Sequence, residues 1–549
     1  MENFQRRRSC DPQTSLVNRM SRKDAPPFLK LIQSMSRPDF YPHPTEQVEL
    51  IQTHISYIFI AGNFVYKLKK PLDFGFLDFT SLDKRRHYCQ EELRLNRRLA
   101  PDIYLGVVGI YENADGRITL SKGDCLIEYA VKMKKLPRDG MLKNLLSLGS
   151  VTPAMMEAIA RKLADFHRQA ETGGIINEAG SVETIRRNHE ENFTATESYI
   201  DITIPEYQYR FIKSYVYHFM REQEALFKKR VADHRIRDGH GDIHLEHICI
   251  MNSHIIIYDC IEFNDRFRHD DTAAEVAFLA MDLEYNGHAD YGDIFVNAYI
   301  RHTDDPEIRR LLNFYKCYYA FVRGKVVGFK TNDEDIQPHE RVEAGRIASS
   351  YFNLAYGCAA RLINPTLILM AGLTGTGKSV RAKWIAPLLG AEIIQTDVVR
   401  KELLDISPTE HRYEAFGRGI YTEDINRRTY KKALELAASK LKEGKSVIMD
   451  ASYKSRAERI GASETAKKLN ADFFIIECVC PEKIIRERLD SRMTEAGEPS
   501  DGRWEIFQAQ KDTFDPIIEF PNTCHITIDT SLSPEACGRK IIEAVRRFS

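Results

Sequence analysis

Hydrophobic and polar positions follow two different patterns along the chain. Around Ala61-Gly62-Asn63 the residues alternate between apolar and polar, which predicts a β-hairpin pairing residues 57–61 with residues 64–68. A helix rich in Glu, Arg and Leu is expected over residues 81–99, before Pro101. Two further strands are expected near residues 106–111 and 125–133, and helical patterns dominate from about residue 151.

The pattern changes after Asn364-Pro365. Residues 366–371 form a continuous apolar run, as expected of a buried parallel strand. Further strand patterns, each separated by a helical pattern, follow at residues 392–396, 447–450 and 473–479. This alternation predicts an α/β domain with a parallel sheet. We therefore expect a disordered tail over residues 1–25, one domain over 26–360 and a second over 361–549.

Composition narrows the class of protein. The chain has 549 residues, of which 43% are hydrophobic and 29% charged, with a net charge of −1. This balance is typical of globular proteins and gives no overall attraction to nucleic acid or membranes. No run reaches the ~18 apolar residues of a membrane span, and no apolar signal region follows the N-terminal arginines. The 11 cysteines form no C-x-x-C pair, which favours free thiols in the cytoplasm.

The sequence G-L-T-G-T-G-K-S lies between a predicted strand and a predicted helix, which is the context of a phosphate-binding P-loop. Its glycines allow backbone amides to surround phosphate oxygens at a helix N-terminus. The lysine is expected to reach the β- and γ-phosphates of ATP, and the serine to join Mg²⁺ coordination. The candidate nucleotide-binding residues are Gly372, Thr374, Gly375, Thr376, Gly377, Lys378 and Ser379.

Acidic and basic residues follow the next predicted strands. Asp397 stands at the end of one strand, where it can accept the proton of an attacking hydroxyl, or alternatively can cap the following helix. Arg400, one helical turn later, is a candidate for binding an anionic substrate. Asp450 ends another strand and is a candidate for the Mg²⁺ shell.

Arginines on a later predicted helix complete this half. Arg488 and Arg492 share a face ahead of residues 495–502, as in the lid of a small kinase, where we assign Arg488 to substrate and Arg492 to catalysis. A solvated charged face is the alternative. Residues 365–549 resemble the zeta-toxin, gluconate-kinase and polynucleotide-kinase-like group of P-loop kinases. The resemblance implies phosphorylation of a hydroxyl on a small molecule or a nucleotide.

A second group of residues lies upstream, in H-G-D-I-H-L-E-H and in a strand that ends near Asp259. With L-A-D-F-H and Y-D-C-I-E-F, these motifs resemble the aminoglycoside phosphotransferase family over residues 45–355. The resemblance implies a bilobal protein-kinase-like fold, with Asp242 near the acceptor hydroxyl and Asp259 on the metal.

The remaining roles in this half follow from the same resemblance. Lys67 and Glu92 are the expected ion pair, with Lys69 or Lys70 left to solvent and Glu91 as a competitor for Glu92. Three further residues complete the set: His244 and Glu262 as substrate contacts and Met133 as the adenine hinge.

This half departs from the family pattern at His247, where the family has asparagine. Neutral imidazole is a poor ligand for Mg²⁺, which prefers oxygen. The metal is then held mainly by Asp259 and water, or the site is impaired, or it uses a softer cation. The cluster of His240, His244 and His247 also fits a zinc site, although zinc requires a closed ligand set.

The sequence thus predicts a mixed α/β and α+β chain with two kinase domains. Each is expected to use ATP and Mg²⁺ to phosphorylate a small-molecule hydroxyl. One alternative is an N-terminal pseudokinase that regulates the P-loop domain, and another is a nucleic-acid end kinase. The neutral net charge argues against the second, and the sequence carries no signal for the oligomeric state.

Overall fold

The computed structural model describes residues 25–252, 254–333, 336–407, 417–492 and 502–548. The chain forms two compact units, Met1–Ala355 (unit 1) and Tyr356–Ser549 (unit 2). We describe each unit by itself.

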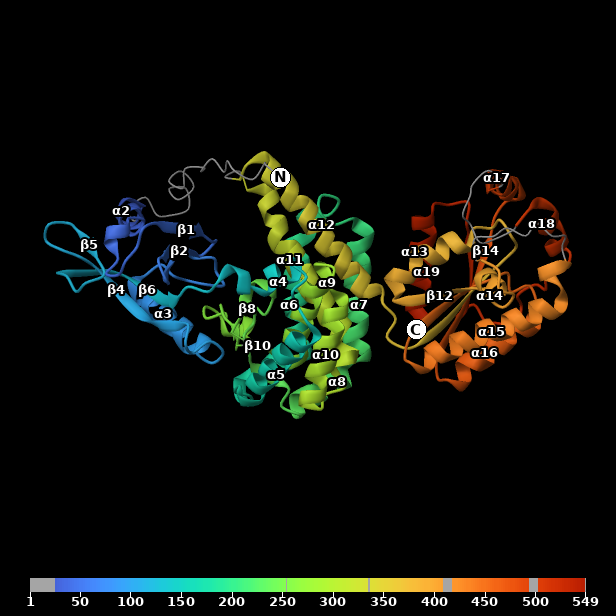
Figure 1. The fold of residues 1–549 in the computed structure, drawn as a ribbon, viewed down its shortest axis with the longest axis horizontal. Helices are drawn as coiled ribbons and strands as arrows, with labels where there is room; N and C mark the ends of the chain where they lie inside the picture. The colour runs from blue at the N-terminus through green and yellow to red at the C-terminus, as the bar shows by residue number, and fades with distance from the viewer. Residues whose placement is uncertain (1–24, 253, 334–335, 408–416, 493–501, 549) are drawn as a thin grey trace. The chain divides into compact units, whose positions relative to one another are not determined.

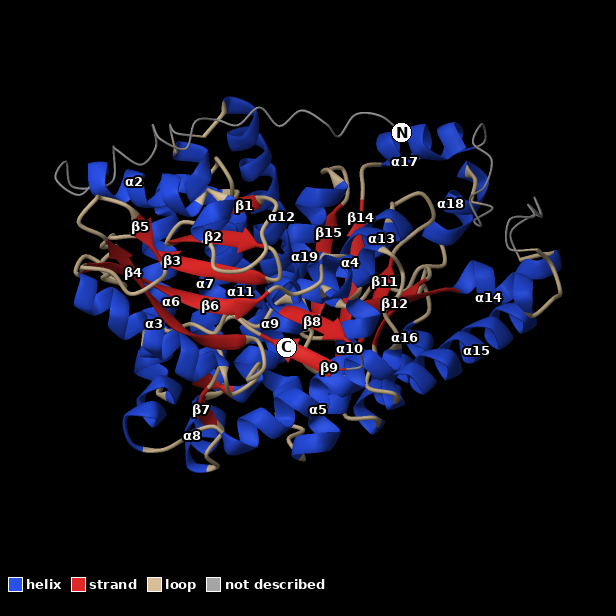
Figure 2. Ribbon diagram, turned by 60° about the vertical axis from the view of Figure 1, so that its left-hand side comes forward, coloured by secondary structure: helices blue, strands red, loops and turns tan. Residues whose placement is uncertain are grey.

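Unit 1 begins with a six-stranded antiparallel sheet in the order β1-β2-β3-β6-β4-β5 (Figure 2). The predicted hairpin is confirmed, because β2 and β3 pair with Ala61 opposite Phe64 across Gly62, whose φ is +57°. The strands are β1 (Val48–Gln52), β2 (Ser56–Ala61), β3 (Phe64–Lys69), β4 (Tyr104–Glu112), β5 (Ile118–Thr119) and β6 (Cys125–Lys134).

Two helices pack on this sheet from opposite sides (Figure 1). Helix α2 (Ala25–Met35) contributes apolar residues to a core that also holds Tyr66 and Leu68 of β3. Side chains alternate along a strand, so Lys67 and Lys69 lie on the other face, where helix α3 (Leu82–Asn96) packs. The sheet therefore directs two lysines at one helix.

The rest of unit 1 is mainly helical. Its central helix, α9, is buried along its length from Thr272 to Leu283 and packs against α10 and α11. Two short antiparallel pairs, β7 with β10 and β8 with β9, lie among the helices. The helices are α4 (Leu142–Ser147), α5 (Pro153–Gln169), α6 (Val182–Thr196), α7 (Glu206–Glu222), α8 (Glu224–Ala232), α9 (Thr272–Tyr285), α10 (Ala289–Thr303), α11 (Ile308–Gly328) and α12 (Pro338–Ala360), of which α12 continues past Ala355 into unit 2. The short strands are β7 (Ile236–Asp238), β8 (Ile248–Met251), β9 (His254–Ile257) and β10 (His269–Asp271).

Unit 2 contains a parallel five-stranded sheet in the order β12-β13-β11-β14-β15, so the parallel sheet predicted from the apolar runs is confirmed. The last strand escaped the sequence analysis. The strands are β11 (Thr366–Ala371), β12 (Ala391–Gln395), β13 (Ser446–Asp450), β14 (Asp472–Val479) and β15 (His525–Asp529). The helices are α13 (Lys378–Leu389), α14 (Thr396–Glu402), α15 (Glu423–Lys442), α16 (Arg456–Lys468), α17 (Glu482–Arg492), α18 (Trp504–Lys511) and α19 (Pro534–Phe548).

The register of this sheet aligns the chemistry of unit 2. Met370 of β11 lies opposite Asp450 of β13, which in turn lies opposite Gln395 of β12. Parallel strands end at the same edge of a sheet, and substrates bind at that edge. The loop after β11, the last residue of β13 and the start of α14 therefore meet at one place.

Candidate functional site

The loop from Gly372 to Ser379 joins β11 to α13 and has the backbone of an anion cradle. Three of its glycines have positive φ, with values of +133° at Gly372, +77° at Gly375 and +80° at Gly377. Side chains other than hydrogen strain this backbone region. Gly377 is also the N-cap of α13, so the loop turns its amides toward the positive end of that helix. The geometry is that of a phosphate-binding loop.

The loop is also packed tightly against its neighbours. A Cβ added at Gly372 would lie 2.6 Å from the carbonyl oxygen of Cys478 in β14. One added at Gly375 would lie 2.8 Å from Ile485 of α17. Beneath the loop, the Thr376 side chain donates to the Leu373 carbonyl at 2.8 Å. Glycine is therefore required here for two reasons: the backbone has a positive φ, and a side chain would not fit.

Lys378 and Thr374 have protein partners in this structure. The Lys378 ammonium donates to the carbonyl oxygen of Leu373 at 2.8 Å, so the side chain folds back over its own loop. The Thr374 backbone N–H donates to the Gln510 side chain of α18, also at 2.8 Å. Both acceptors are neutral, whereas a phosphate offers these donors ionised oxygen atoms, which form stronger hydrogen bonds. A triphosphate would therefore displace them readily.

Oxygen atoms suited to Mg²⁺ stand beside the loop. Asp450 is only 6% exposed and accepts a hydrogen bond from the Gln395 side chain at 3.0 Å. Ser379 is the second residue of α13 and lines the same cavity as Asp450. Carboxylate and hydroxyl oxygens are the ligands that Mg²⁺ accepts. The two residues fit the cation of a bound nucleotide.

Arg400 of α14 is buried, with 5% of its surface exposed, and it contacts three neighbouring side chains. Its guanidinium donates to the Asn426 side chain at 2.6 Å, lies 4.9 Å from the centre of the Tyr421 ring and approaches Asp397 to 3.9 Å. Gln395, and not Asp397, is the N-cap of α14. The capping role weighed for Asp397 is therefore wrong, because Asp397 is the second residue of the helix and lies two positions after the N-cap.

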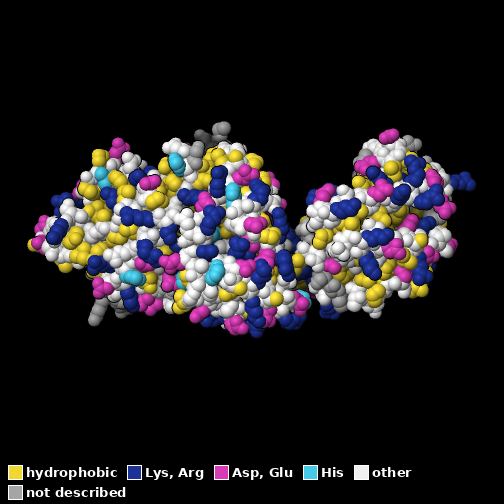
Figure 3. Space-filling model, turned by 90° about the horizontal axis from the view of Figure 1, so that it is seen from below, with side chains coloured by type: hydrophobic (Ala, Val, Ile, Leu, Met, Phe, Trp, Pro, Cys, Tyr) yellow, Lys and Arg dark blue, Asp and Glu magenta, His cyan; other side chains and the backbone are white. Residues whose placement is uncertain are grey.

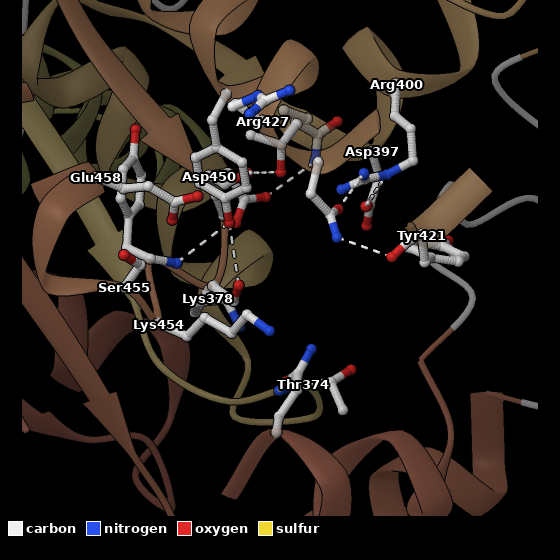
Figure 4. Close-up of a pocket in the computed structure, with 18 of the residues that line it drawn as sticks. Thr374, Lys378, Asp397, Arg400, Tyr421, Arg427, Asp450, Lys454, Ser455 and Glu458 are labelled. Atoms are coloured by element: carbon white, nitrogen blue, oxygen red, sulfur yellow. Dashed lines mark hydrogen bonds and ion pairs between the residues drawn. The ribbon is translucent and has the colours of Figure 1, made fainter. Parts of the chain in front are cut away.

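One cavity of about 860 Å³ gathers these side chains (Figure 4). It is lined by the P-loop residues Thr374, Gly375, Gly377, Lys378 and Ser379, and by Asp397, Arg400, Asp450, Lys454 and Glu458. The volume is that of a site for small molecules. Residues from three strand ends and from α14 and α16 thus face a common space.

Lys454 and Glu458 were missed in the sequence analysis. They follow Asp450 within eight residues, in the loop after β13 and the first turn of α16. The available signal was a strand end followed by charged residues at a one-turn spacing, which is also typical of a solvated helix start. Burial raises the pKa of Glu458 to about 7, and its Oε2 atom has no hydrogen-bond partner among the described residues.

One of the two expected lid arginines, Arg488, is placed differently from the prediction. Arg488 is absent from the residues that line the cavity and donates instead to the carbonyl oxygen of Thr530 at 2.6 Å. It thereby supports the back of the P-loop, because a Cβ at Gly377 would lie 3.2 Å from its Nη1 atom. The substrate contact expected of Arg488 is thus not what this geometry provides. The Arg492 side chain and residues 493–501, where the lid was expected, lie outside the described part of the chain.

Unit 1 contains a second charged cluster, which is buried. Lys67 pairs with Asp259 at 2.5 Å and with Glu92 at 2.9 Å, while Lys69 pairs with Glu92 at 2.8 Å and with Glu262. Burial alone would lower the pKa of Lys67, but Asp259 and Glu92 outweigh it and hold this pKa well above its ordinary value. Two ammonium groups therefore share three carboxylates between β3, α3 and the segment after β9.

Several expectations for this cluster need correction. Lys69 is fully buried and not solvated, and Lys70 is also buried. Glu91 does not compete with Glu92, because it pairs with Arg94 at 2.7 Å on the outer face of α3. Glu262 is buried against Lys69, so its carboxylate supports the lysine and is not directed at a substrate.

Met133 lies near the end of β6, and its role as the adenine hinge stays a prediction. It pairs with Val65 inside β6, which ends one residue later at Lys134. Its side chain belongs to an apolar cluster that includes Tyr104 of β4 and Ile256 of β9. This cluster joins the sheet to the β8–β9 pair, so Met133 packs where the two parts of unit 1 meet.

The loop 240–247 is held from behind by a chain of hydrogen bonds. The backbone amides of His240 and Gly241 both donate to one carboxylate oxygen of Glu275 in α9. The other oxygen of Glu275 lies 2.6 Å from His167, whose second ring nitrogen lies 2.6 Å from the Tyr299 hydroxyl. The L-A-D-F-H motif on α5 thus fixes the loop through Glu275.

The loop places Asp242, His244 and His247 together. His247 lies between two carboxylates, with Nδ1 3.4 Å from Asp242 and Nε2 3.4 Å from Asp259. His244 approaches Asp242 to 3.6 Å and stacks on His247 with ring centres 3.9 Å apart. Burial would raise the pKa of Asp242, but the two imidazoles hold it below its ordinary value. The structure thus brings Lys67, Glu92, Asp242, His247 and Asp259 to one place.

Comparisons with known proteins match unit 2 alone or the two units together. A family described as "AAA domain" matches residues 367–517. The uncharacterized proteins Rv2004c and MT2060 of Mycobacterium tuberculosis are each 30% identical over 465 residues, which is 84% of this chain and 89% of theirs. A UPF0200 protein of Aeropyrum pernix is 30% identical over 148 residues, 26% of this chain and 72% of its own. The mycobacterial matches extend across both units.

Solved structures resemble this chain more distantly. A sugar kinase from Janibacter has a TM-score of 0.27 at 18% identity and covers 33% of this chain and 95% of its own. The APS kinase CysC of Mycobacterium tuberculosis, in complex with AMPPNP and APS, has a TM-score of 0.25 at 16% identity, covering 33% and 98%. Among the described residues, none of the helices has the length and apolar character needed to cross a membrane.

The raised pKa of Glu458 makes a prediction about stability. A carboxyl group that titrates near 7 when folded and near 4.5 when unfolded holds its proton more tightly in the folded state. Its stabilising contribution is complete below pH 4.5 and is lost as the pH rises through 7. We expect Glu458→Gln to become more stable relative to the parent between pH 5.5 and pH 8.5 in urea unfolding. Glu464→Gln, at an exposed position of the same helix, is the control for helix propensity. An unchanged difference at both pH values would contradict the prediction.

Proposed function

This chain belongs to the family of the Mycobacterium tuberculosis protein Rv2004c, and we propose that its unit 2 transfers the γ-phosphate of ATP to a hydroxyl group of a small molecule. The observation that carries the proposal is the shared cavity. A phosphate-binding loop, an acidic residue at a strand end and a buried arginine all face it. A nucleotide switch or motor needs no such acceptor space beside its phosphates, whereas a small-molecule kinase does.

Several residues of the cavity have a role that their position allows. The loop amides and Lys378 would neutralise the phosphate oxygens as charge shifts during transfer. Asp397 would accept the proton of the acceptor hydroxyl, and Arg400, held by Asn426 and Tyr421, would orient an anionic or polar part of that acceptor. Mg²⁺, when bound at Ser379 and Asp450, supplies positive charge to the phosphates.

A screen of hydroxyl-bearing metabolites tests this function. The full chain is incubated with ATP and Mg²⁺, and mass spectrometry detects products that have gained one phosphate. We expect Lys378→Ala and Asp397→Asn each to lower the rate of that product by roughly 100-fold or more, because each removes charge or proton transfer from the reacting centre. Lys383→Ala, which changes an exposed lysine of the same helix, is the matched control. Equal rates in parent and both active-site variants would overturn the proposal.

For unit 1 we propose a second phosphotransfer site. The supporting observation is that Lys67, paired with Glu92, reaches Asp259 while Asp242 lies across His247 from it. Lysine and metal-binding aspartate around a triphosphate, with a further aspartate at the acceptor, are the parts of a protein-kinase-like site. The chain would then be bifunctional, with one site in each unit.

Separate substitutions distinguish the two sites. We expect Asp242→Asn to abolish one class of phosphorylated product and Asp397→Asn to abolish another, because each removes the acceptor aspartate of a different unit. Mass spectrometry of the same metabolite library measures both. If Asp242→Asn leaves every product unchanged, unit 1 is not catalytic. The pseudokinase alternative then stands, provided that unit 1 still binds nucleotide.

A nucleic-acid end kinase is less well supported. Lysine and arginine are interspersed with aspartate and glutamate over the face drawn in Figure 3, and the net charge of the chain is −1. Binding to a nucleic-acid backbone draws its affinity from clustered positive charge. Phosphorylation of oligonucleotide ends by the full chain would favour this alternative over a small-molecule acceptor.

A further inference from the structure

The hydrogen bonds of His247 fix which of its ring nitrogens carries a proton. Nδ1 lies 2.9 Å from the backbone carbonyl oxygen of Asp242. A carbonyl only accepts hydrogen bonds, so Nδ1 carries the proton and donates. In the neutral ring, the lone pair is then on Nε2. This pattern, with one ring N–H on a backbone carbonyl and the other nitrogen available, is the one found in metal-ligating histidines.

The available nitrogen faces the carboxylate of Asp259, a residue that Lys67 and Tyr104 hold in place. Nε2 of His247 lies 3.4 Å from Oδ2 of Asp259. The other carboxylate oxygen of Asp259 is paired with Lys67, and its backbone N–H donates to the Tyr104 hydroxyl at 3.1 Å. Asp259 has a φ of +64°, a left-handed backbone conformation that aspartate adopts more readily than most residues.

His244 differs from His247 in its bonding. Its Nδ1 accepts the backbone N–H of Glu246 at 3.3 Å, so in the neutral ring the proton is on Nε2. Nε2 in turn lies 3.6 Å from Asp242, to which it can donate. His244 thus orients Asp242 and is not itself arranged as a ligand. Asp242, His244 and His247 nevertheless offer ligand atoms that all lie within 4.8 Å of one another.

In the neutral ring, the Nε2 lone pair and the Asp259 oxygen face each other at 3.4 Å and repel unless a proton or a metal ion lies between them. An imidazole nitrogen with a carboxylate oxygen is a donor set for first-row transition metals, whereas Mg²⁺ selects oxygen donors. We propose that unit 1 binds a divalent transition-metal ion through His247 Nε2 and Asp259 Oδ2, in preference to Mg²⁺. The proposal rests on the second phosphotransfer site proposed for unit 1, where the bound triphosphate would complete the coordination. Unit 2, with Ser379 and Asp450, has oxygen ligands only.

Electron spin echo spectroscopy of Mn²⁺ tests the nitrogen ligand directly. The full chain is loaded with Mn²⁺ and a β,γ-methylene analogue of ATP, whose bridge contains no nitrogen. A coordinated imidazole produces nitrogen modulation, and oxygen ligands such as those of unit 2 do not. We expect the parent to show modulation from one imidazole and His247→Asn to lose it. His244→Asn, the matched control, should keep it because His244 is arranged as a donor.

The preference between metals gives a second readout. Competition of Mg²⁺ against bound Mn²⁺ should become at least about tenfold more effective in His247→Asn, because an amide oxygen replaces the nitrogen. Urea unfolding of each variant establishes that it is folded. Absence of nitrogen modulation in the parent, or its persistence in His247→Asn, would overturn the proposal.

The outcomes also separate this proposal from the second active site. If Mg²⁺ alone supports product formation that depends on Asp242 and the parent shows no nitrogen modulation, the metal assignment fails and the active site stands. If nitrogen modulation depends on His247 but Asp242→Asn changes no product, unit 1 binds the metal without phosphotransfer.

Discussion

The chemistry of unit 2 depends on the close approach of one loop to the end of a parallel sheet. Gly372 leaves β11 so near to β14 that a Cβ would lie 2.6 Å from the Cys478 carbonyl oxygen. The loop then turns toward the start of α13, where Gly377 is the N-cap. Because β13 lies next to β11 in register, the same turn places Asp450 beside the loop. The positions of the P-loop and of Asp450 are thus consequences of strand order.

The two units differ in how their charged residues are arranged. In unit 2, charged residues surround an open cavity, and Lys378 rests on a neutral carbonyl that a phosphate can replace. In unit 1, Lys67 and Lys69 are buried on three carboxylates. Removing one member of such a buried network leaves an unpaired charge and costs about 3–5 kcal/mol. The network therefore holds β3, α3 and the segment after β9 in a fixed arrangement before any ligand binds.

The sequence predicted the features of the fold that depend on a few neighbouring residues. The P-loop depends on glycines at fixed spacing, and the hairpin at Gly62 depends on a positive φ, so both could be read directly from the chain. Contacts between residues that are distant in sequence were harder to predict. The burial of Lys69 by Glu262, 193 residues away, depends on how the sheet packs on the helical part. In the sequence, Glu458 resembles a solvated helix residue. Only the position of α16 in the fold shows that it lines the cavity.

Hydrogen–deuterium exchange of the P-loop peptide tests whether the backbone amides of this loop hold the phosphates of a nucleotide. Peptides covering residues 372–379 are followed in the full chain with and without the β,γ-methylene analogue of ATP. The readout is confined to unit 2, so nucleotide binding in unit 1 does not obscure it. We expect slower exchange of the Gly375–Ser379 amides at saturating analogue, and loss of that protection in Gly377→Ala, where the added methyl group strains a φ of +80°. Unchanged exchange in the parent at saturating analogue would show that these amides do not hold the phosphates.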